Sequence, residues 1–219
     1  DKLPENERSK CLLTLKTEAV FDPGTDLPAV IEYFGTNNVR ILDHKLSTQE
    51  MDMLYNTADG VVQLSNAEGW GLSLTEAMLT GTPFIATVTG GMQDQMRFED
   101  ENGKWIEFTS EIPSNHHGKY KKHGEWAFPV YPKTSGIVGS PQTPYIYDDH
   151  IDAKDASEQM MKLYKMGNEE RKRIGKLGQE WALGDEAGFT SEKMSNKIIE
   201  AAEKLFTTWK PRKKYSFLK

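Results

Sequence analysis

A short apolar run that leads through a glycine-rich turn into a helix-forming run constrains the fold of this chain most. Residues 59–64 read as a short buried strand, and residues 74–79 are rich in helix formers and end before Gly81. The turn between them reads E-G-W-G-L-S-L-T-E over residues 68–76. A helix that starts there points its free N–H groups and positive dipole end at the carboxyl edge of a sheet. Open α/β sheets bind phosphorylated ligands at that edge.

Further strands and helices alternate along the chain at the spacing of βαβ units. Besides residues 59–64, strands are expected at 12–17, 39–42, 84–88 and 105–108. Helices are expected at 26–34 and after Ser47, where Glu50 has the spacing of a capping-box partner. The predicted fold class is therefore α/β, with a doubly wound, Rossmann-like parallel sheet.

This pattern breaks between residues 109 and 147. The segment is rich in Pro, Gly, His and aromatic residues and shows no sustained periodicity. Segments of this length without regular structure are generally functional or disordered, and the aromatic content argues against disorder. We expect an ordered but irregular insertion near the site. Apolar stripes then predict a C-terminal helical segment over residues 153–209.

Charge and cysteine content limit the function classes. The chain of 219 residues has a net charge of -6, whereas nucleic-acid binding requires a basic face, so we expect no nucleic-acid partner. The single Cys11 cannot form an internal disulfide, and residues 1–10 are too charged for a signal peptide. A reducing, cytoplasmic location is the simplest interpretation.

The end of the chain is a local exception to this acidic balance. Lys210, Arg212, Lys213 and Lys214 are followed by Tyr215, Phe217 and Leu218. Peripheral contact with anionic lipid is one interpretation. A solvated tail, or one that docks on a partner domain, is favoured because a lone basic run is a weak signal.

Each of the two glutamates of the turn also has a simpler interpretation than a role in catalysis or ligand binding. Ser73 and Glu76 have the spacing of a capping box, in which the carboxylate reaches back to the Ser73 N–H. Glu68, which precedes Gly69 in a turn, also fits a solvated surface carboxylate.

Two other clusters match metal motifs only weakly. They are His116, His117 and His123, and Asp148, Asp149, His150 and Asp152. The histidines have no cysteine partners at a metal-binding spacing, and the acids precede a helix, whose dipole favours them there. We expect no metal or other cofactor.

The motif and its neighbours together resemble a known family. Glu68 and Glu76 have seven residues between them and are followed by an E-A-M helix, a G-T-P turn, a second strand and Gly90-Gly91. In this order and spacing, residues 54–94 resemble the donor-binding half of retaining GT-B glycosyltransferases with the E-x7-E signature. Trp70 stands where phenylalanine is more usual.

The resemblance implies roles for individual residues. Glu68 would contact the donor sugar near the bond that breaks, and Glu76 would hydrogen-bond the ribose. The backbone amides between them would contact the diphosphate, which makes Gly69, Trp70, Gly71, Leu72 and Ser73 candidate substrate-binding residues. His44 and Lys45 follow a strand and would border the nucleobase, although an exposed polar loop is the simpler interpretation of both.

The same resemblance implies that residues 1–219 form one C-terminal, nucleotide-sugar-binding GT-B domain whose first strand and helix are missing. The acceptor-binding N-terminal domain is also missing, so we expect the fragment alone to be inactive. The implied reaction transfers a hexose from a nucleotide diphosphate sugar to an acceptor hydroxyl with retention of configuration. A catalytically silent binding module and a sugar-nucleotide epimerase of the same fold remain alternatives.

Overall fold

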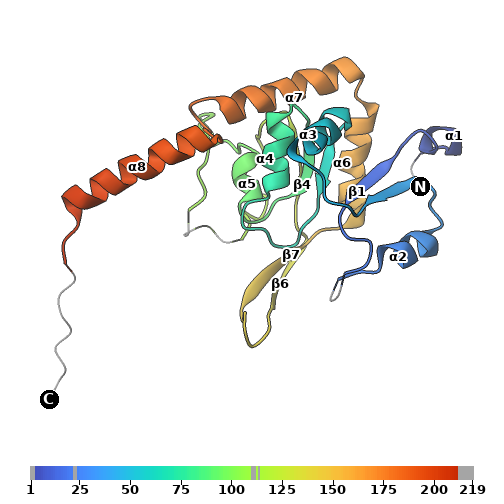
Figure 1. The fold of residues 1–219 in the computed structure, drawn as a ribbon, viewed down its shortest axis with the longest axis horizontal. Coiled ribbons are helices and arrows are strands. Elements are labelled where there is room, and N and C mark those ends of the chain that lie inside the picture. The colour runs from blue at the N-terminus through green and yellow to red at the C-terminus, as the bar shows by residue number, and fades with distance from the viewer. Residues whose placement is uncertain (1–2, 22–23, 110–111, 113, 212–219) are drawn as a thin grey trace. The chain divides into compact units, whose positions relative to one another are not determined.

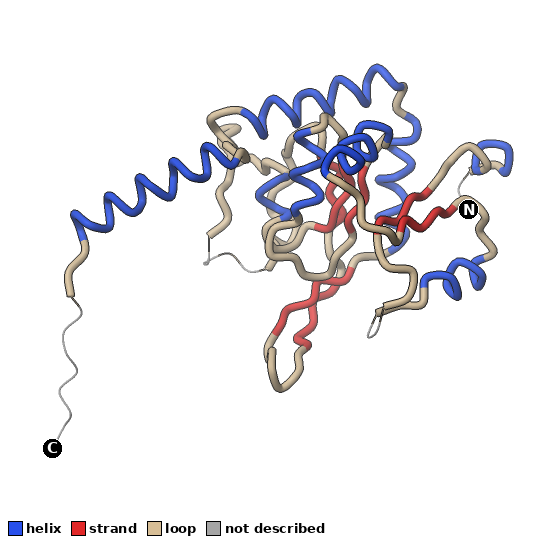
Figure 2. The backbone as a smooth tube through the Cα atoms, in the orientation of Figure 1, coloured by secondary structure: helices blue, strands red, loops and turns tan. Residues whose placement is uncertain are grey.

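The computed structural model describes residues 3–21, 24–109, 112 and 114–211 (Figures 1 and 2). The chain divides into two compact units, unit 1 (Asp1–Leu54) and unit 2 (Tyr55–Lys219). Unit 1 contains α1 (Glu5–Arg8), β1 (Leu13–Lys16), α2 (Leu27–Phe34) and β2 (Val39–Leu42). It is followed by α3 (Thr48–Thr57), which begins in unit 1 and ends in unit 2. β1 and β2 pair in parallel, as expected for a βαβ unit.

Capping contacts in unit 1 confirm two predicted helix starts. α2 begins after Asp26, whose side chain accepts a hydrogen bond from the Ala29 N–H (3.0 Å), and ends at Gly35 with a φ of 59°. α3 begins after Ser47 with a complete capping box. Glu50 Oε2 accepts from the Ser47 N–H (2.7 Å), and Ser47 Oγ accepts from the Glu50 N–H (3.3 Å).

Unit 2 is built on a parallel sheet with helices against it. Its first elements are β3 (Val61–Gln63), α4 (Leu72–Leu79), β4 (Phe84–Thr87), α5 (Met92–Gln95) and β5 (Ala127–Val130). The three strands lie in the order β3-β4-β5. Phe84 and Ala86 pack into one apolar cluster with side chains of α4 and α5, whereas Ile85 packs into a second cluster. Burial on both faces is typical of parallel sheets.

Helices complete unit 2 after the sheet. They are α6 (Ala153–Lys165), α7 (Asn168–Leu183) and α8 (Ser191–Thr208). Ala156 and Leu163 of α6 and Ile174 of α7 belong to the second cluster, beside Ile85. These helices confirm the predicted helical segment. No helix among the described residues has the length and apolar character needed to cross a membrane.

The prediction of an irregular segment at 109–147 is wrong for its second half. β5 lies in the sheet, and β6 (Thr134–Val138) forms an antiparallel hairpin with β7 (Ile146–His150). β5 has only four residues, A-F-P-V, which is too short for a period to show, and its proline is tolerated because β5 is at the edge of the sheet.

The strand expected at 105–108 does not form. Only an isolated bridge joins Glu99 and Trp105. Trp105 instead packs edge-to-face on Trp181 of α7 (centroids 5.4 Å apart), and the Phe108 N–H donates to Asp94 Oδ1 (3.3 Å). Residues 105–108 are therefore held by aromatic packing and by a hydrogen bond to the Asp94 side chain, and they do not pair as a strand.

α7 approaches the end of α4 closely because glycine lets the backbones meet. A Cβ on Gly175 would lie 1.8 Å from the carbonyl oxygen of Gly81. A Cβ on Gly178 would lie 2.7 Å from Cγ of Trp126, which precedes β5. α7 is thereby fixed against both the α4 and the β5 side of the sheet.

We expect Gly175→Ala to lower the free energy of unfolding by about 1–3 kcal/mol, because the new methyl group meets fixed backbone. Urea unfolding followed by circular dichroism measures this loss. Gly136→Ala is the control, because a Cβ there meets nothing within 4 Å. Equal stability of the two variants would contradict the close helix contact.

Candidate functional site

Glu68 lies in the loop that leads from β3 to α4 and is half-buried. Its Oε2 accepts a hydrogen bond from Nε2 of Gln63, the last residue of β3 (3.0 Å). Gly71 precedes α4 with a φ of 84°, a left-handed conformation that favours glycine. A Cβ there would also lie 3.1 Å from Cγ of Met92. The turn into α4 therefore depends on glycine at position 71.

Gly90 and Gly91, which follow β4, lie against this loop backbone to backbone. The Gly91 N–H donates to the carbonyl oxygen of Glu68 (3.2 Å). A Cβ on Gly90 would lie 1.9 Å from that oxygen, and one on Gly91 would lie 2.3 Å from the carbonyl oxygen of Gly69. A side chain at either position would displace the loop.

Gln95 of α5 binds the other end of the loop. Its Nε2 donates to the carbonyl oxygens of Trp70 (2.5 Å) and Gly71 (3.2 Å), and its Oε1 accepts from Oγ1 of Thr75 (2.8 Å). Oγ1 of Thr75 accepts in turn from Nε1 of Trp70 (2.9 Å). Gln95 is fully buried, so these hydrogen bonds satisfy its amide and fix the loop. Sequence reasoning missed it, because a lone glutamine has no motif.

α4 begins at Leu72, so the backbone amides of its first turn lie where the loop ends. Ser73 lies inside the helix, and its hydroxyl donates to Oε1 of Gln63. Glu76 Oε2 accepts from the hydroxyl of Tyr55 (2.7 Å). The capping-box interpretation of Ser73 and Glu76 is therefore wrong. Burial, together with the Glu76 carboxylate, raises the pKa of Tyr55, so the phenol stays protonated and donates to Glu76.

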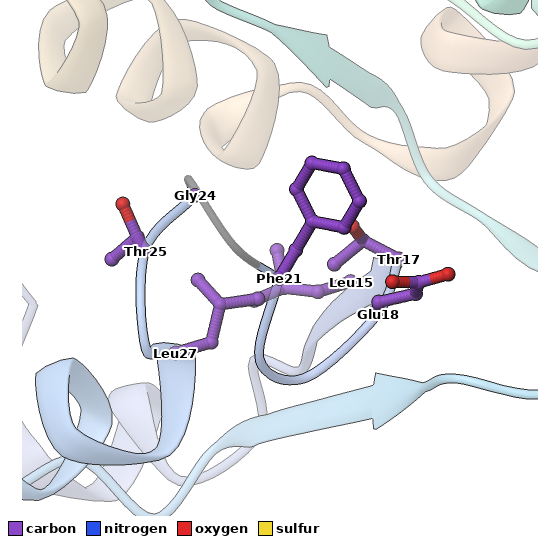
Figure 3. Close-up of a pocket in the computed structure, with 7 residues that line it drawn as sticks. All are labelled: Leu15, Thr17, Glu18, Phe21, Gly24, Thr25 and Leu27. Carbon is purple, nitrogen blue, oxygen red and sulfur yellow. The ribbon is translucent and has the colours of Figure 1, made fainter.

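The structure thus places Glu68, the glycine-rich turn and Glu76 in unit 2, and His44 and Lys45 in unit 1. Both of these side chains are exposed, directly after β2. Unit 1 also has a cavity of about 490 Å³ after the end of β1, shown in Figure 3. It is lined by Leu15, Thr17, Glu18, Phe21, Gly24, Thr25 and Leu27, so neither His44 nor Lys45 contributes to it.

Asp149 of β7 is a fully buried carboxylate that joins four separate segments of unit 2. It accepts hydrogen bonds from Thr89 Oγ1 (2.7 Å), Asn115 Nδ2 (2.8 Å) and Ser135 Oγ. Its own N–H donates to the carbonyl oxygen of Asn66, two residues before Glu68 (2.8 Å). Burial opposes ionisation, but these hydrogen bonds outweigh it and lower the pKa of Asp149. Asp149 therefore acts as a buried anion that positions the loop.

We expect Asp149→Ala to lower the free energy of unfolding by about 2–4 kcal/mol, because it leaves buried donors without an acceptor. Thermal or urea unfolding measures the change. Asp148→Ala is the matched control, because successive strand residues face opposite sides. A loss as large in the control as in Asp149→Ala would argue against the buried anion.

His116 lies in an aromatic cluster and is buried. Its ring stacks on Phe108 (centroids 5.8 Å apart) and packs against the ring of Phe98 (4.4 Å). Nδ1 accepts a hydrogen bond from the Tyr120 N–H (3.3 Å), and burial lowers the pKa of His116 to about 4. The neutral ring thus has a packing role in this segment.

The acidic residues at 148–152, which match a metal motif weakly, have structural roles at two positions. Asp152 caps α6 by accepting from the Lys154 N–H (2.8 Å), as the helix-dipole interpretation predicts. Asp149 is engaged by hydroxyl and amide donors. Within the part of the chain that the structure describes, no three metal-ligating side chains form a group.

Because burial lowers the pKa of His116, we expect the folded chain to lose stability in acid. The pKa of this ring falls from 6.5 to about 4 on folding, so the unfolded chain takes up the proton first as the pH drops. The neutral His116 ring contributes fully to the free energy of unfolding above pH 6.5. Between pH 6.5 and pH 4 this free energy falls by on the order of 3 kcal/mol. Unfolding free energies in urea across this pH range measure it.

A pair of variants isolates the contribution of His116. His116→Gln should reduce the acid decline, because one titrating group is gone, while His123, whose pKa burial also lowers, keeps part of it. His117→Asn should keep the full decline, since His117 is exposed and Asn tolerates its positive φ of 49°. An unchanged decline in His116→Gln would contradict the assignment.

A family profile described as "Glycosyl transferases group 1" matches residues 30–113, a range that includes Glu68 and Glu76. No curated protein matches the chain significantly by sequence.

Solved structures share the fold. Anabaena HepE in complex with UDP-glucose matches with a TM-score of 0.53 and 16% identity, over 89% of this chain and 43% of HepE. A glycosyltransferase from Rickettsia africae matches with a TM-score of 0.55 and 14% identity, over 91% of this chain and 41% of that protein. The chain therefore spans less than half the length of these proteins. Its α/β fold with parallel sheets is similar to GT-B glycosyltransferase structures.

Proposed function

We propose that this chain is the donor-binding domain of a retaining glycosyltransferase, which transfers a hexose from a nucleotide diphosphate sugar to an acceptor hydroxyl. The observation that carries the proposal is the loop at 68–71, which passes from Glu68 directly into the first turn of α4. The family profile spans this loop. Anabaena HepE was solved with UDP-glucose and with UDP and glucose, so UDP-glucose is the first donor to test.

The backbone amides from Gly69 to Ser73 bind the diphosphate in this proposal. A helix N-terminus offers unpaired N–H groups and a positive dipole end to an anion. Negative charge builds on the leaving diphosphate as the bond to the sugar breaks, and donors already in place stabilise that charge without reorganisation. No metal ion takes part, because the amides meet the charge.

The two glutamates position the donor. Glu68 holds the sugar near the breaking bond, and the hydrogen bond from Gln63 orients its carboxylate. Glu76 binds the ribose hydroxyls, and Tyr55 orients it in the same way. The acceptor is bound by an N-terminal domain outside this chain.

Two alternative functions would use the same donor-binding site but would release a different product. A sugar-nucleotide epimerase returns an isomerised donor, and a silent binding module returns the donor unchanged. Analysis of the sugar products formed by the longer protein, with the candidate acceptors present and absent, separates all three.

Donor binding is tested by calorimetric titration with UDP, GDP and ADP and their glucose and mannose conjugates. One nucleotide series should bind. Glu76→Ala should weaken that binding by about 1.5–3 kcal/mol, because hydrogen bonds to a charged group are lost.

Glu180→Ala is the matched control, because Glu180 is a carboxylate on an exposed part of α7, with a side chain 60% exposed. Its affinity should equal that of the unchanged chain. Equal weakening in both variants, or no binding of any nucleotide to the chain or to a longer form with the missing domain, would contradict the proposal.

A further inference from the structure

Trp70 is the one large side chain between the two glycines of the loop at 68–71. Glycine has more conformational freedom than any other residue, and Gly71 has a left-handed φ of 84°. A backbone of this kind keeps one conformation only where other groups hold it. The contacts of the Trp70 side chain therefore decide how firmly the loop is held.

One contact of this side chain is polar and lies within the loop and α4. Nε1 of Trp70 donates to Oγ1 of Thr75 (2.9 Å). Another contact is aromatic and comes from a distant part of the chain. The ring of Phe189 packs edge-to-face on the Trp70 ring, with centroids 5.1 Å apart and an interplanar angle of 88°. Such pairs are favourable beyond the apolar area that they bury. The loop is thus also held by the turn at 184–190, which joins α7 to α8.

Phe189 is itself held in a defined orientation. Gly188, directly before it, has a φ of 65°, which lets the chain reverse direction at this point. The Phe189 N–H donates to the carbonyl oxygen of Ala182 (2.9 Å), and the ring also packs edge-to-face on Trp181 (centroids 5.2 Å apart). The Phe189 ring therefore reaches Trp70 from a backbone that α7 fixes.

The same turn has an attachment that does not involve Phe189. Arg97, which follows α5, forms a two-point ion pair with Glu186. Its Nε donates to Oε2 (2.7 Å) and its Nη2 donates to Oε1 (3.2 Å). Oε2 of Glu186 also accepts from Nε1 of Trp181 (2.6 Å). Removal of the Phe189 ring therefore takes away the contact with Trp70 but leaves the turn attached.

We propose that Phe189 is a positioning residue for donor binding. Acting through Trp70, it keeps the backbone amides from Gly69 to Ser73 in the conformation that receives the diphosphate. This inference rests on the function proposed above. Donors that are already in place bind an anion without a further loss of conformational freedom. Without the Phe189 ring the loop samples other conformations, and the apparent affinity falls with the fraction that is competent to bind.

The test compares two Phe→Ala variants by calorimetric titration with UDP-glucose. Phe189→Ala should weaken binding by about threefold to tenfold, the range expected for one edge-to-face pair. Phe206→Ala is the matched control, because Phe206 lies on α8 and is 85% exposed. Its affinity should stay within about twofold of the unchanged chain. Circular dichroism verifies that both variants keep the fold.

Two further substitutions at the same position separate the ring from its bulk. Phe189→Tyr keeps the ring and should keep the affinity. Phe189→Leu keeps most of the apolar volume but lacks the ring, so it should weaken binding by about twofold or more. Phe189→Leu also supplies the comparison if Phe189→Ala does not fold.

A second readout needs no ligand. The Trp70 indole proton is observed by NMR in the ¹⁵N-labelled chain, and Trp70→Phe identifies its resonance. Phe189→Ala should speed the exchange of this proton with solvent by about threefold or more, because the loop opens more often. Phe206→Ala should leave the exchange rate unchanged. A contact that only adds to global stability would move neither the affinity nor this local exchange.

The outcomes separate this role from donor binding itself. If Phe189→Ala binds UDP-glucose as tightly as the unchanged chain, donor binding stands and the positioning role is overturned. Equal weakening by Phe189→Ala and Phe206→Ala, or an unchanged indole exchange rate in Phe189→Ala, also overturns it. If the unchanged chain and a longer form with the missing domain bind no nucleotide, the proposed function fails and this role fails with it.

Discussion

The contact between the loop at 68–71 and the glycine pair at 90–91 determines the candidate site. β3 and β4 are neighbouring parallel strands, so the loops that follow them leave from the same edge of the sheet. The two backbones meet there at distances that leave no room for a Cβ on Gly90 or Gly91. This contact fixes where α4 starts, and the start of α4 sets where its free amides lie.

Buried polar groups from distant parts of the chain hold this contact in place. Gln95 binds the carbonyl groups of the loop from α5, and Asp149 binds the backbone before Glu68 from β7. Both are fully buried, and a buried polar group is stable only when its hydrogen bonds are satisfied. The segment at 109–147, which looks like an insertion by its composition, therefore supports the site through Asn115, whose Nδ2 donates to the buried carboxylate of Asp149 just after it.

Turns and helix starts could be predicted from the sequence, because they depend on residues that are close together in the chain. The glycine-rich turn, the helix expected from residue 26 and the Ser47–Glu50 capping box follow rules that span only a few residues. The structure confirms the capping box, and it shows that Asp26 caps the earlier helix. β5 was missed because four residues show no period. The partner of Glu76 was missed because Tyr55 lies 21 residues earlier in the chain, beyond the reach of any helix-start rule. Gln95 and Asp149 were missed as positioning residues for the same reason.

Binding of the diphosphate at the start of α4 is tested most directly by an NMR titration of the ¹⁵N-labelled chain with UDP-glucose, with each backbone amide observed separately. We predict that the largest shifts fall on the amides of the loop and the first turn of α4, Leu72 and Ser73 above all, with smaller shifts at Gly90 and Gly91. Shifts confined to unit 1, around the cavity after β1, would contradict it, because the diphosphate would then bind without the helix N-terminus.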